Sequence, residues 1–122
     1  MATVLIVDDE PSLVTPLRFL MEQHGHAVCV VTDGDEVVPA VRSHRPDLVL
    51  LDINLPSRDG YEVCEALRAE PNADAVRIVM LTVNSREVDR ERGLALGADA
   101  YITKPFGIQE VIDRVESLLS SR

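Results

Sequence analysis

The sequence has 122 residues, which is the size of one ordinary domain and enough for a real hydrophobic core. Its 21 acidic and 12 basic side chains give a net charge of −9, which argues against binding to nucleic acid or to an anionic membrane. Hydrophobic residues make up 46%, which excludes a disordered chain, and no apolar run approaches the roughly 20 residues of a transmembrane helix. With no signal-peptide pattern and with Cys29 and Cys64 outside any motif, we expect a reduced, cytoplasmic protein.

Short apolar runs that predict strands alternate with amphipathic segments that predict helices. We expect strands at 4–7, 27–31, 48–51, 78–81 and 100–102. The third is apolar without interruption, which is typical of a strand buried on both faces of a parallel sheet. The predicted helices end at Gly25, begin at the capping residues Asp33 and Asp59, run from Asn84 or Ser85 to Gly97, and cover 108–119, with a turn at 71–74.

Two prolines fall inside predicted helices. In a helix interior, Pro16 and Pro39 would each cost about 3 kcal/mol. Thr15 and Pro16 could instead be the cap and first residue of a helix that starts late. Pro39 has no such alternative, so we predict a kink or a loosened first turn in the second helix.

Five strand–helix units in sequence predict an α/β protein. Parallel neighbours need a crossover, and right-handed crossovers place helices on both faces of the sheet. We therefore expect a flavodoxin-like (βα)5 three-layer sandwich with a parallel five-stranded sheet in the common order 2-1-3-4-5. Ligands bind such sheets beyond the carboxyl ends of the strands, where the order reverses between the first and third strands.

Polar residues stand at those carboxyl ends. The first strand is followed by Asp8 and Asp9, the third by Asp52, the fourth by Thr82 and the fifth by Lys104. Taken alone, Asp8 and Asp9 suit a helix cap, and Thr82 suits a strand end. Lys104 alone suits a solvated loop. Their joint placement at one edge of the sheet favours a functional site over these separate explanations.

The combination of residue types indicates phosphoryl chemistry. Three carboxylates within several Å repel one another by about 4 kcal/mol per close pair at an effective dielectric near 20. A divalent cation lets them all stay ionised, and hard oxygen ligands favour Mg²⁺. A carboxylate beside the metal can attack phosphorus and form an acyl phosphate, while a lysine and a hydroxyl stabilise the transferring group. Since the chain has no Gly-rich phosphate loop, the donor is expected to be a small molecule or another protein.

At these residues the sequence resembles the receiver domain of two-component response regulators. The resemblance covers essentially the whole chain, so we expect one receiver domain over 1–122. It rests on these motifs in order: Asp8-Asp9-Glu10, Leu51-Asp52-Ile53-Asn54-Leu55-Pro56, Asp59-Gly60, Leu81-Thr82, Gly97-Ala98-Asp99, Tyr101 and Lys104-Pro105-Phe106.

The resemblance implies a role for each acid. Asp52 would be the phosphoacceptor and would take its phosphoryl group from a histidine kinase or a histidine phosphotransfer protein. Asp9, Asp52 and the backbone carbonyl of Asn54 would hold Mg²⁺, with Asp8 helping through water. The chain would be a signalling phosphoprotein, and not an enzyme beyond the phosphorylation and dephosphorylation of its own aspartate.

The resemblance also implies a switch. Lys104 would pair with the phosphoryl group, and the peptide bond between Lys104 and Pro105 is expected to be cis. Thr82 would move toward the phosphoryl group, and Tyr101 would rotate inward into the vacated space. The change is expected to shift a population of conformers and not to make a new fold.

The output face would recruit a partner or control an effector domain. It would combine the predicted helix 84–97, strand 100–102 and helix 108–119. In many DNA-binding relatives this face pairs two copies and has two acids before the tyrosine, whereas here Asp99 remains and Ala100 replaces the second. Glu110, Arg114 and the charges over 86–92 leave such a homodimer open.

Three side chains beside the pocket are expected to affect its chemistry, and one of them departs from the family pattern. Val83 stands where the family usually has Ala or Gly, and its two extra methyl groups should narrow the pocket mouth. We therefore predict slow exchange with small-molecule donors and slow loss of the phosphoryl group. Asn54 and Asn84 flank the pocket and should tune the position of a hydrolytic water.

Two other functions fit part of this pattern. A haloacid-dehalogenase-like phosphatase also uses an aspartate nucleophile with Mg²⁺, but its second acid stands where this chain has Asn54, and its cap insertion is missing. A degenerate receiver would bind partners without phosphorylation, and the complete set of acids with Thr82 and Lys104 argues against it. His24, His26 and His44 are expected at the surface, away from the site.

Overall fold

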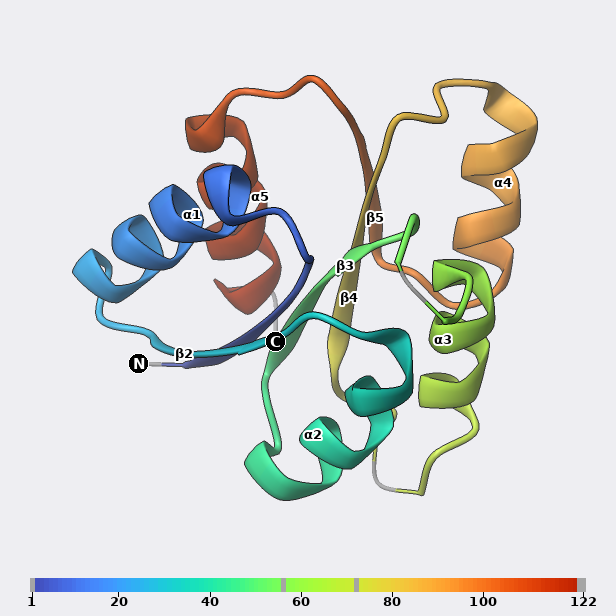
Figure 1. Ribbon diagram of the computed structural model, residues 1–122, viewed down its shortest axis with the longest axis horizontal. Helices are drawn as coiled ribbons and strands as arrows, with labels where there is room; N and C mark the ends of the chain where they lie inside the picture. Colours follow the sequence, from blue (N-terminus) through green and yellow to red (C-terminus); the bar gives the residue numbers. More distant parts are fainter. Residues whose placement is uncertain (1, 56, 72, 121–122) are drawn as a thin grey trace.

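The computed structural model describes residues 2–55, 57–71 and 73–120, in which strands and helices alternate (Figure 1). The strands are β1 (Thr3–Val7), β2 (Ala27–Val31), β3 (Leu48–Asp52), β4 (Arg77–Thr82) and β5 (Ala100–Thr103). The α-helices are α1 (Pro11–Gln23), α2 (Val37–His44), α3 (Gly60–Arg68), α4 (Glu87–Ala95) and α5 (Ile108–Ser120), and a 3₁₀ turn, η1 (Gly34–Glu36), precedes α2. None of the helices in these residues is long and apolar enough to cross a membrane.

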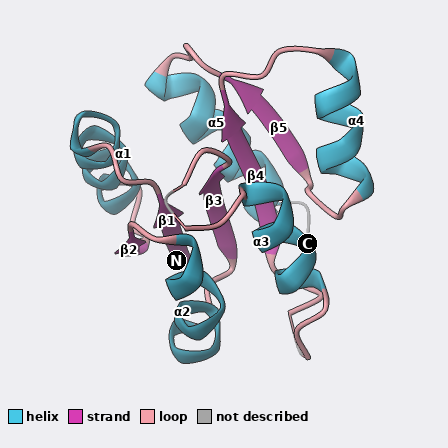
Figure 2. Ribbon diagram, turned by 45° about the vertical axis from the view of Figure 1, so that its right-hand side comes forward, coloured by secondary structure: helices cyan, strands magenta, loops and turns pink. Residues whose placement is uncertain are grey.

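The described strands form one parallel sheet in the order β2-β1-β3-β4-β5 (Figure 2). This order confirms the predicted flavodoxin-like arrangement. The register pairs Val7 with Leu51, and Leu51 with Met80. Because the strands run in the same direction and end level, the residues that follow Val7 lie beside the last residue of β3.

Helices cover both faces of the sheet: α1 and α5 lie on one side, and α2, α3 and α4 on the other (Figure 1). Successive side chains of a strand point to opposite faces. Val4 and Ile6 therefore join the core under α1 and α5, whereas Leu5 and Val7 join the core under α2 and α3. The same alternation explains why β3, buried on both faces, is an unbroken apolar run up to Asp52.

Pro16 lies inside α1, which begins at Pro11. The alternative in which Thr15 and Pro16 start a late helix is therefore wrong. A proline at the first helical position costs nothing, because that N–H has no intrahelical acceptor. At Pro16, by contrast, the missing N–H leaves the carbonyl of Ser12 without its intrahelical donor.

The second helix is preceded by a looser turn, as predicted, but the expectation that Pro39 can lie only in the helix interior is wrong. The turn before α2 is the 3₁₀ helix Gly34–Glu36, and the regular α-helix begins only at Val37. Pro39 is then the third residue of α2, where the backbone N–H would have no intrahelical partner in any case. The chain thus avoids the cost expected for a proline in a helix interior.

Two of the predicted helix caps are confirmed and one is wrong. The carboxylate of Asp33 accepts a hydrogen bond from the amide of Asp35, and that of Asp59 from the amide of Tyr61. The residue that precedes α4 is Arg86, not Asn84 or Ser85. Residue 72 of the predicted turn at 71–74 lies outside the described part of the chain, and so does residue 56 of the motif at 51–56.

Candidate functional site

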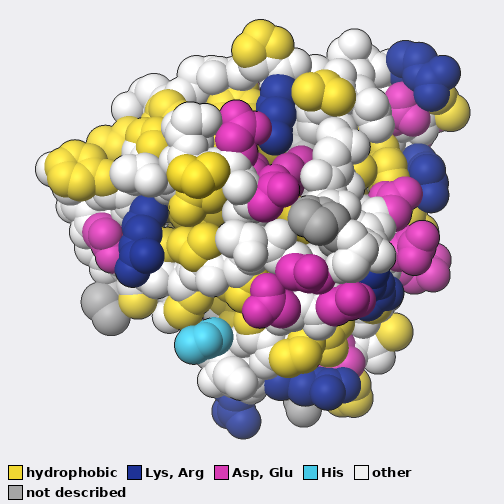
Figure 3. Space-filling model, viewed as in Figure 1, with side chains coloured by type: hydrophobic (Ala, Val, Ile, Leu, Met, Phe, Trp, Pro, Cys, Tyr) yellow, Lys and Arg dark blue, Asp and Glu magenta, His cyan; other side chains and the backbone are white. Residues whose placement is uncertain are grey.

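The carboxyl edge of the sheet holds three acids. Asp8 and Asp9 follow β1, and Asp52 ends β3, the strand next to it. One carboxylate oxygen of each lies within 4.8 Å of the others. Neither Asp8 nor Asp9 caps α1, since the N-cap residue is Glu10, so the helix-cap explanation is wrong for both. Acidic side chains are visible over this part of the molecule in Figure 3.

Lys104, the single lysine of the sequence, faces these acids from the end of β5. Its Nζ lies 3.5 Å from Oδ1 of Asp52 and 3.7 Å from Oδ2 of Asp8. The peptide bond between Lys104 and Pro105 is cis, and the amide of Lys104 donates to the carbonyl of Thr82 at the end of β4. One ammonium therefore faces a group of three carboxylates.

Asp8 is the most deeply buried of these acids. Its side chain is 1% exposed, and its Oδ2 has no hydrogen-bond partner among the described residues. Burial raises the pKa of Asp8 and the neighbouring charge of Asp52 adds to this, although the hydrogen bond from the amide of Glu10 lowers it. A buried anionic oxygen without a donor is what a hard cation would satisfy, so these residues fit Mg²⁺.

The backbone after Asp52 turns sharply around its carboxylate. Oδ1 of Asp52 accepts a hydrogen bond from the amide of Asn54 at 3.1 Å. Gly60 at the start of α3 packs against this turn, and a Cβ on it would lie only 2.4 Å from Cα of Ile53. Gly60 is therefore required for the close approach of α3, a role that its place after a capping aspartate did not reveal.

Thr82, Asn84 and Tyr101 form a connected group beside the acids. Thr82 is fully buried, and its Oγ1 accepts a hydrogen bond from the amide of Asn84. The hydroxyl of Tyr101, buried under α4, donates to the carbonyl of Asn84 at 2.9 Å. These two bonds use both backbone groups of Asn84, which explains why it does not cap α4. Val83, between the two, is 61% exposed.

The structure corrects two predictions about residues outside the site. His26 is not a surface residue: its side chain is 7% exposed, with Nε2 2.6 Å from a carboxylate oxygen of Glu116 on α5. His24 and His44 are exposed, as expected. Asp99, expected on the output face, is bound within the chain by Arg68 and Arg77.

Known proteins are similar to this chain in sequence and fold. Residues 4–116 match the family model of the response regulator receiver domain. The chain is 44% identical over 116 residues to the alkaline phosphatase synthesis transcriptional regulatory protein PhoP of Bacillus subtilis, an alignment that covers 95% of this chain and 48% of PhoP. The chain thus spans about half the length of that relative.

Solved receiver domains superpose on the whole of this fold. The receiver domain of the sensor histidine kinase PA1611 of Pseudomonas aeruginosa, which has a magnesium ion in its active-site cleft, is 32% identical with a TM-score of 0.87 and 98% coverage of each chain. The BeF3-activated receiver domain of RstA of Klebsiella pneumoniae is 31% identical with a TM-score of 0.86, and the alignment covers 96% of this chain and 97% of RstA. With the acidic pocket described above, these findings show that the chain belongs to the receiver domain family of two-component response regulators.

Proposed function

We propose that residues 1–122 form a single receiver domain in which Asp52 accepts a phosphoryl group from the phosphohistidine of a histidine kinase or a histidine phosphotransfer protein. The observation that carries this proposal is the pocket at the carboxyl edge. Three carboxylate oxygens lie within 4.8 Å of one another, and one ammonium lies 3.5 Å from the proposed acceptor. Such an arrangement suits a cationic or phosphoryl ligand.

Asp9, Asp52 and the backbone carbonyl of Asn54 would hold Mg²⁺, with Asp8 helping through water. The donor set is made of hard oxygens. Oδ2 of Asp8 accepts no hydrogen bond among the described residues and has the Lys104 ammonium at 3.7 Å, which supports the presence of a further cation. When bound, Mg²⁺ supplies positive charge to the oxygens of the transferring phosphoryl group.

In the transfer step, a carboxylate oxygen of Asp52 attacks phosphorus as the bond from phosphorus to the donor histidine breaks, and the electron pair of that bond stays on the imidazole nitrogen. The ammonium of Lys104, already beside Asp52, neutralises charge on the phosphoryl oxygens. The hydroxyl of Thr82 gives up its position near Asn84 and donates to the same group. The product is an aspartyl phosphate on the chain itself, so the domain signals and does not turn over an external substrate.

The output would pass through the α4-β5-α5 face, because Thr82 and Tyr101 both contact the loop that leads into α4. We propose that this face controls an effector domain or a separate cytoplasmic partner, and that the acidic domain itself binds neither nucleic acid nor membrane. Asp99 is already held by two arginines. Pairing of two copies would therefore depend on Glu110, Arg114 and the charges of α4.

Labelling with a small phosphoryl donor tests the proposal. Wild-type protein, Asp52→Asn and the control Asp113→Asn are incubated with Mg²⁺ and acetyl phosphate, and the mass of each chain is measured. Asp113 is an exposed acid on α5, so its variant has the same net charge as Asp52→Asn. One phosphoryl group is expected on wild type and on Asp113→Asn, and none on Asp52→Asn.

The other outcomes identify the rival functions. Continuous release of phosphate from an ester substrate would indicate the haloacid-dehalogenase-like phosphatase. Wild-type protein that neither gains a phosphoryl group nor binds beryllofluoride with Mg²⁺ would be a degenerate receiver. Labelling of Asp52→Asn at the wild-type level would contradict the assignment of the acceptor.

A further inference from the structure

The two tyrosines of the sequence meet inside the molecule, although 40 residues separate them. Tyr61 belongs to the first turn of α3, and Tyr101 to β5. Their hydroxyl oxygens lie 3.3 Å apart, and the two side chains belong to residues only 3% and 6% exposed. The pair joins α3, which begins beside the acidic pocket, to the strand that carries the proposed switch.

Counting protons gives this contact a direction. The hydroxyl of Tyr101 donates its one proton to the carbonyl of Asn84. Where the two hydroxyls bond, Tyr61 is therefore the donor, and the carbonyl of Asp89, at 3.2 Å, competes for the same proton. Burial raises the pKa of Tyr101, so Tyr101 keeps its proton.

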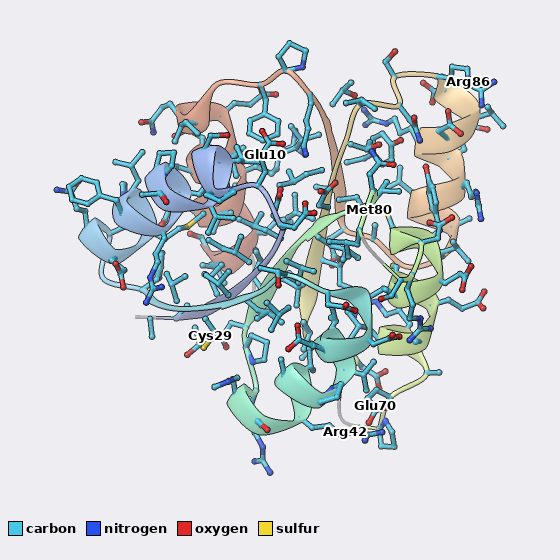
Figure 4. The ribbon with its side chains drawn as sticks, viewed as in Figure 1. Glu10, Cys29, Arg42, Glu70, Met80 and Arg86 are labelled. Carbon is cyan, nitrogen blue, oxygen red and sulfur yellow. The ribbon has the colours of Figure 1, made fainter. Side chains whose placement is uncertain are left out.

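Packing holds both rings in place. The guanidinium carbon of Arg92 lies 4.1 Å from the centre of the Tyr61 ring, a cation–π contact from α4. Gly93 lies over Tyr101: a Cβ there would be 3.2 Å from its ring and 2.8 Å from Sδ of Met80. Figure 4 shows Met80 in the interior beside the sheet. Because residue 93 has no side chain, α4 can close over Tyr101 in its buried position.

We propose that Tyr61 is a positioning residue that holds Tyr101 inward and thereby couples α3 to the phosphoryl pocket. The hydrogen bonds run from Tyr61 to Tyr101, from Tyr101 to the carbonyl of Asn84, and from the amide of Asn84 to Thr82. This inference rests on the proposed function, because it assigns a bias to the same switch. Tyr61 favours the buried arrangement before any phosphoryl group arrives.

Such a bias changes the affinity for a phosphoryl mimic. A ligand that prefers the conformer with Tyr101 inward binds more tightly when that conformer is already populated. Removing one neutral hydrogen bond is expected to reduce that population, and with it the affinity for beryllofluoride, by roughly two- to tenfold. The attack by Asp52 is not affected, because Tyr61 does not touch the acids.

Tyr61→Phe tests the coupling, with Glu62→Gln as the control on the exposed side of the same turn. Beryllofluoride is titrated in the presence of Mg²⁺, and the tyrosine rings are followed by NMR with labelled tyrosine. In Tyr61→Phe, Tyr101 is the single remaining tyrosine, so its signal reports the switch without overlap. We expect a shifted or broadened Tyr101 signal in the free variant, weaker beryllofluoride binding and unchanged final labelling by acetyl phosphate. Glu62→Gln should match wild type.

Two further results separate the possible failures. Wild-type beryllofluoride affinity and an unchanged Tyr101 signal in Tyr61→Phe would overturn the coupling while leaving the proposed function intact. If wild type itself does not bind beryllofluoride, the proposed function fails, and the Tyr101 signal of the free variant still decides whether Tyr61 positions it. Should Tyr61→Phe not fold, Tyr101→Phe supplies the reverse measurement: the Tyr61 signal must shift if the two hydroxyls interact.

Discussion

Aspartates at the two ends of the sheet have opposite surroundings. At the carboxyl end, Asp8 and Asp52 share one ammonium with Asp9 close by, and one buried oxygen has no hydrogen-bond donor among the described residues. At the amino end, Asp99 alone receives a guanidinium of Arg68 at 3.0 Å, one of Arg77 at 3.6 Å and the amide of Ile78 at 2.8 Å. Figure 4 shows a further balanced pair, Arg42 and Glu70, at the end opposite Glu10.

This difference separates a binding site from a structural contact. Removing a carboxylate that has enough donors destabilises the fold, because the charges that it paired are left without an acceptor. Carboxylates with too few donors destabilise the fold in the absence of a cation. Binding of a cation removes this cost, and its removal favours binding. Replacing an aspartate is therefore expected to lower the stability of the fold at the amino end of the sheet and to raise it at the carboxyl end.

The largest effect is expected from Asp99→Ala. Two guanidiniums and an amide would lose their shared acceptor, and we expect the free energy of unfolding to fall by about 2–4 kcal/mol. Urea unfolding followed by circular dichroism measures the change. Asp99→Asn keeps an oxygen for the amide of Ile78 and should lose less. If both variants are as stable as wild type, Asp99 is not the structural contact we describe.

Asp8→Asn should raise the free energy of unfolding, and by less than Asp99→Ala lowers it. Burial raises the folded-state pKa of Asp8 above its ordinary value of 3.8. The carboxyl group therefore contributes stability below pH 3.8 that is lost as the pH rises through the raised pKa. At pH 7 without metal, Asp8→Asn should therefore be more stable than wild type.

Mg²⁺ should make wild type more stable than Asp8→Asn. It is expected to raise the Tm of wild type and to raise that of Asp8→Asn less, because the variant has lost one anionic oxygen of the site. Thermal unfolding with EDTA and with MgCl₂ measures both effects. A destabilised Asp8→Asn in EDTA at pH 7 would show that the acids are balanced by the chain alone.

The smallest effect is expected from Val83→Ala at the mouth of the acidic pocket. Losing two methyl groups should speed both labelling by acetyl phosphate and loss of the phosphoryl group by roughly threefold, less than 1 kcal/mol in each barrier. Val88→Ala on α4 is the matched control, since both valines are 61% exposed. Equal rates for wild type and Val83→Ala would mean that Val83 does not restrict the pocket.

Much of the fold follows from local sequence. The apolar run of β3 and the helical spacing of α5 are set by residues close together in the chain, and so are the Asp33 and Asp59 caps. The convergence of Asp8, Asp9 and Asp52 also follows once the strand order is known, because parallel strands end at one edge. The start of α4 was mispredicted, since Asn84 bonds to residues of β4 and β5.

The sequence by itself determined the alternation of strands and helices and the set of side chains that reaches the carboxyl edge, because both depend on periodicity and on strand ends. Only the tertiary structure decided which polar residues are paired. The binding of Asp99 by Arg68, the contact of His26 with Glu116 and the meeting of the two tyrosines each join residues at least 31 positions apart. Such contacts depend on how helices pack across the sheet, and no pattern within a single segment records that geometry.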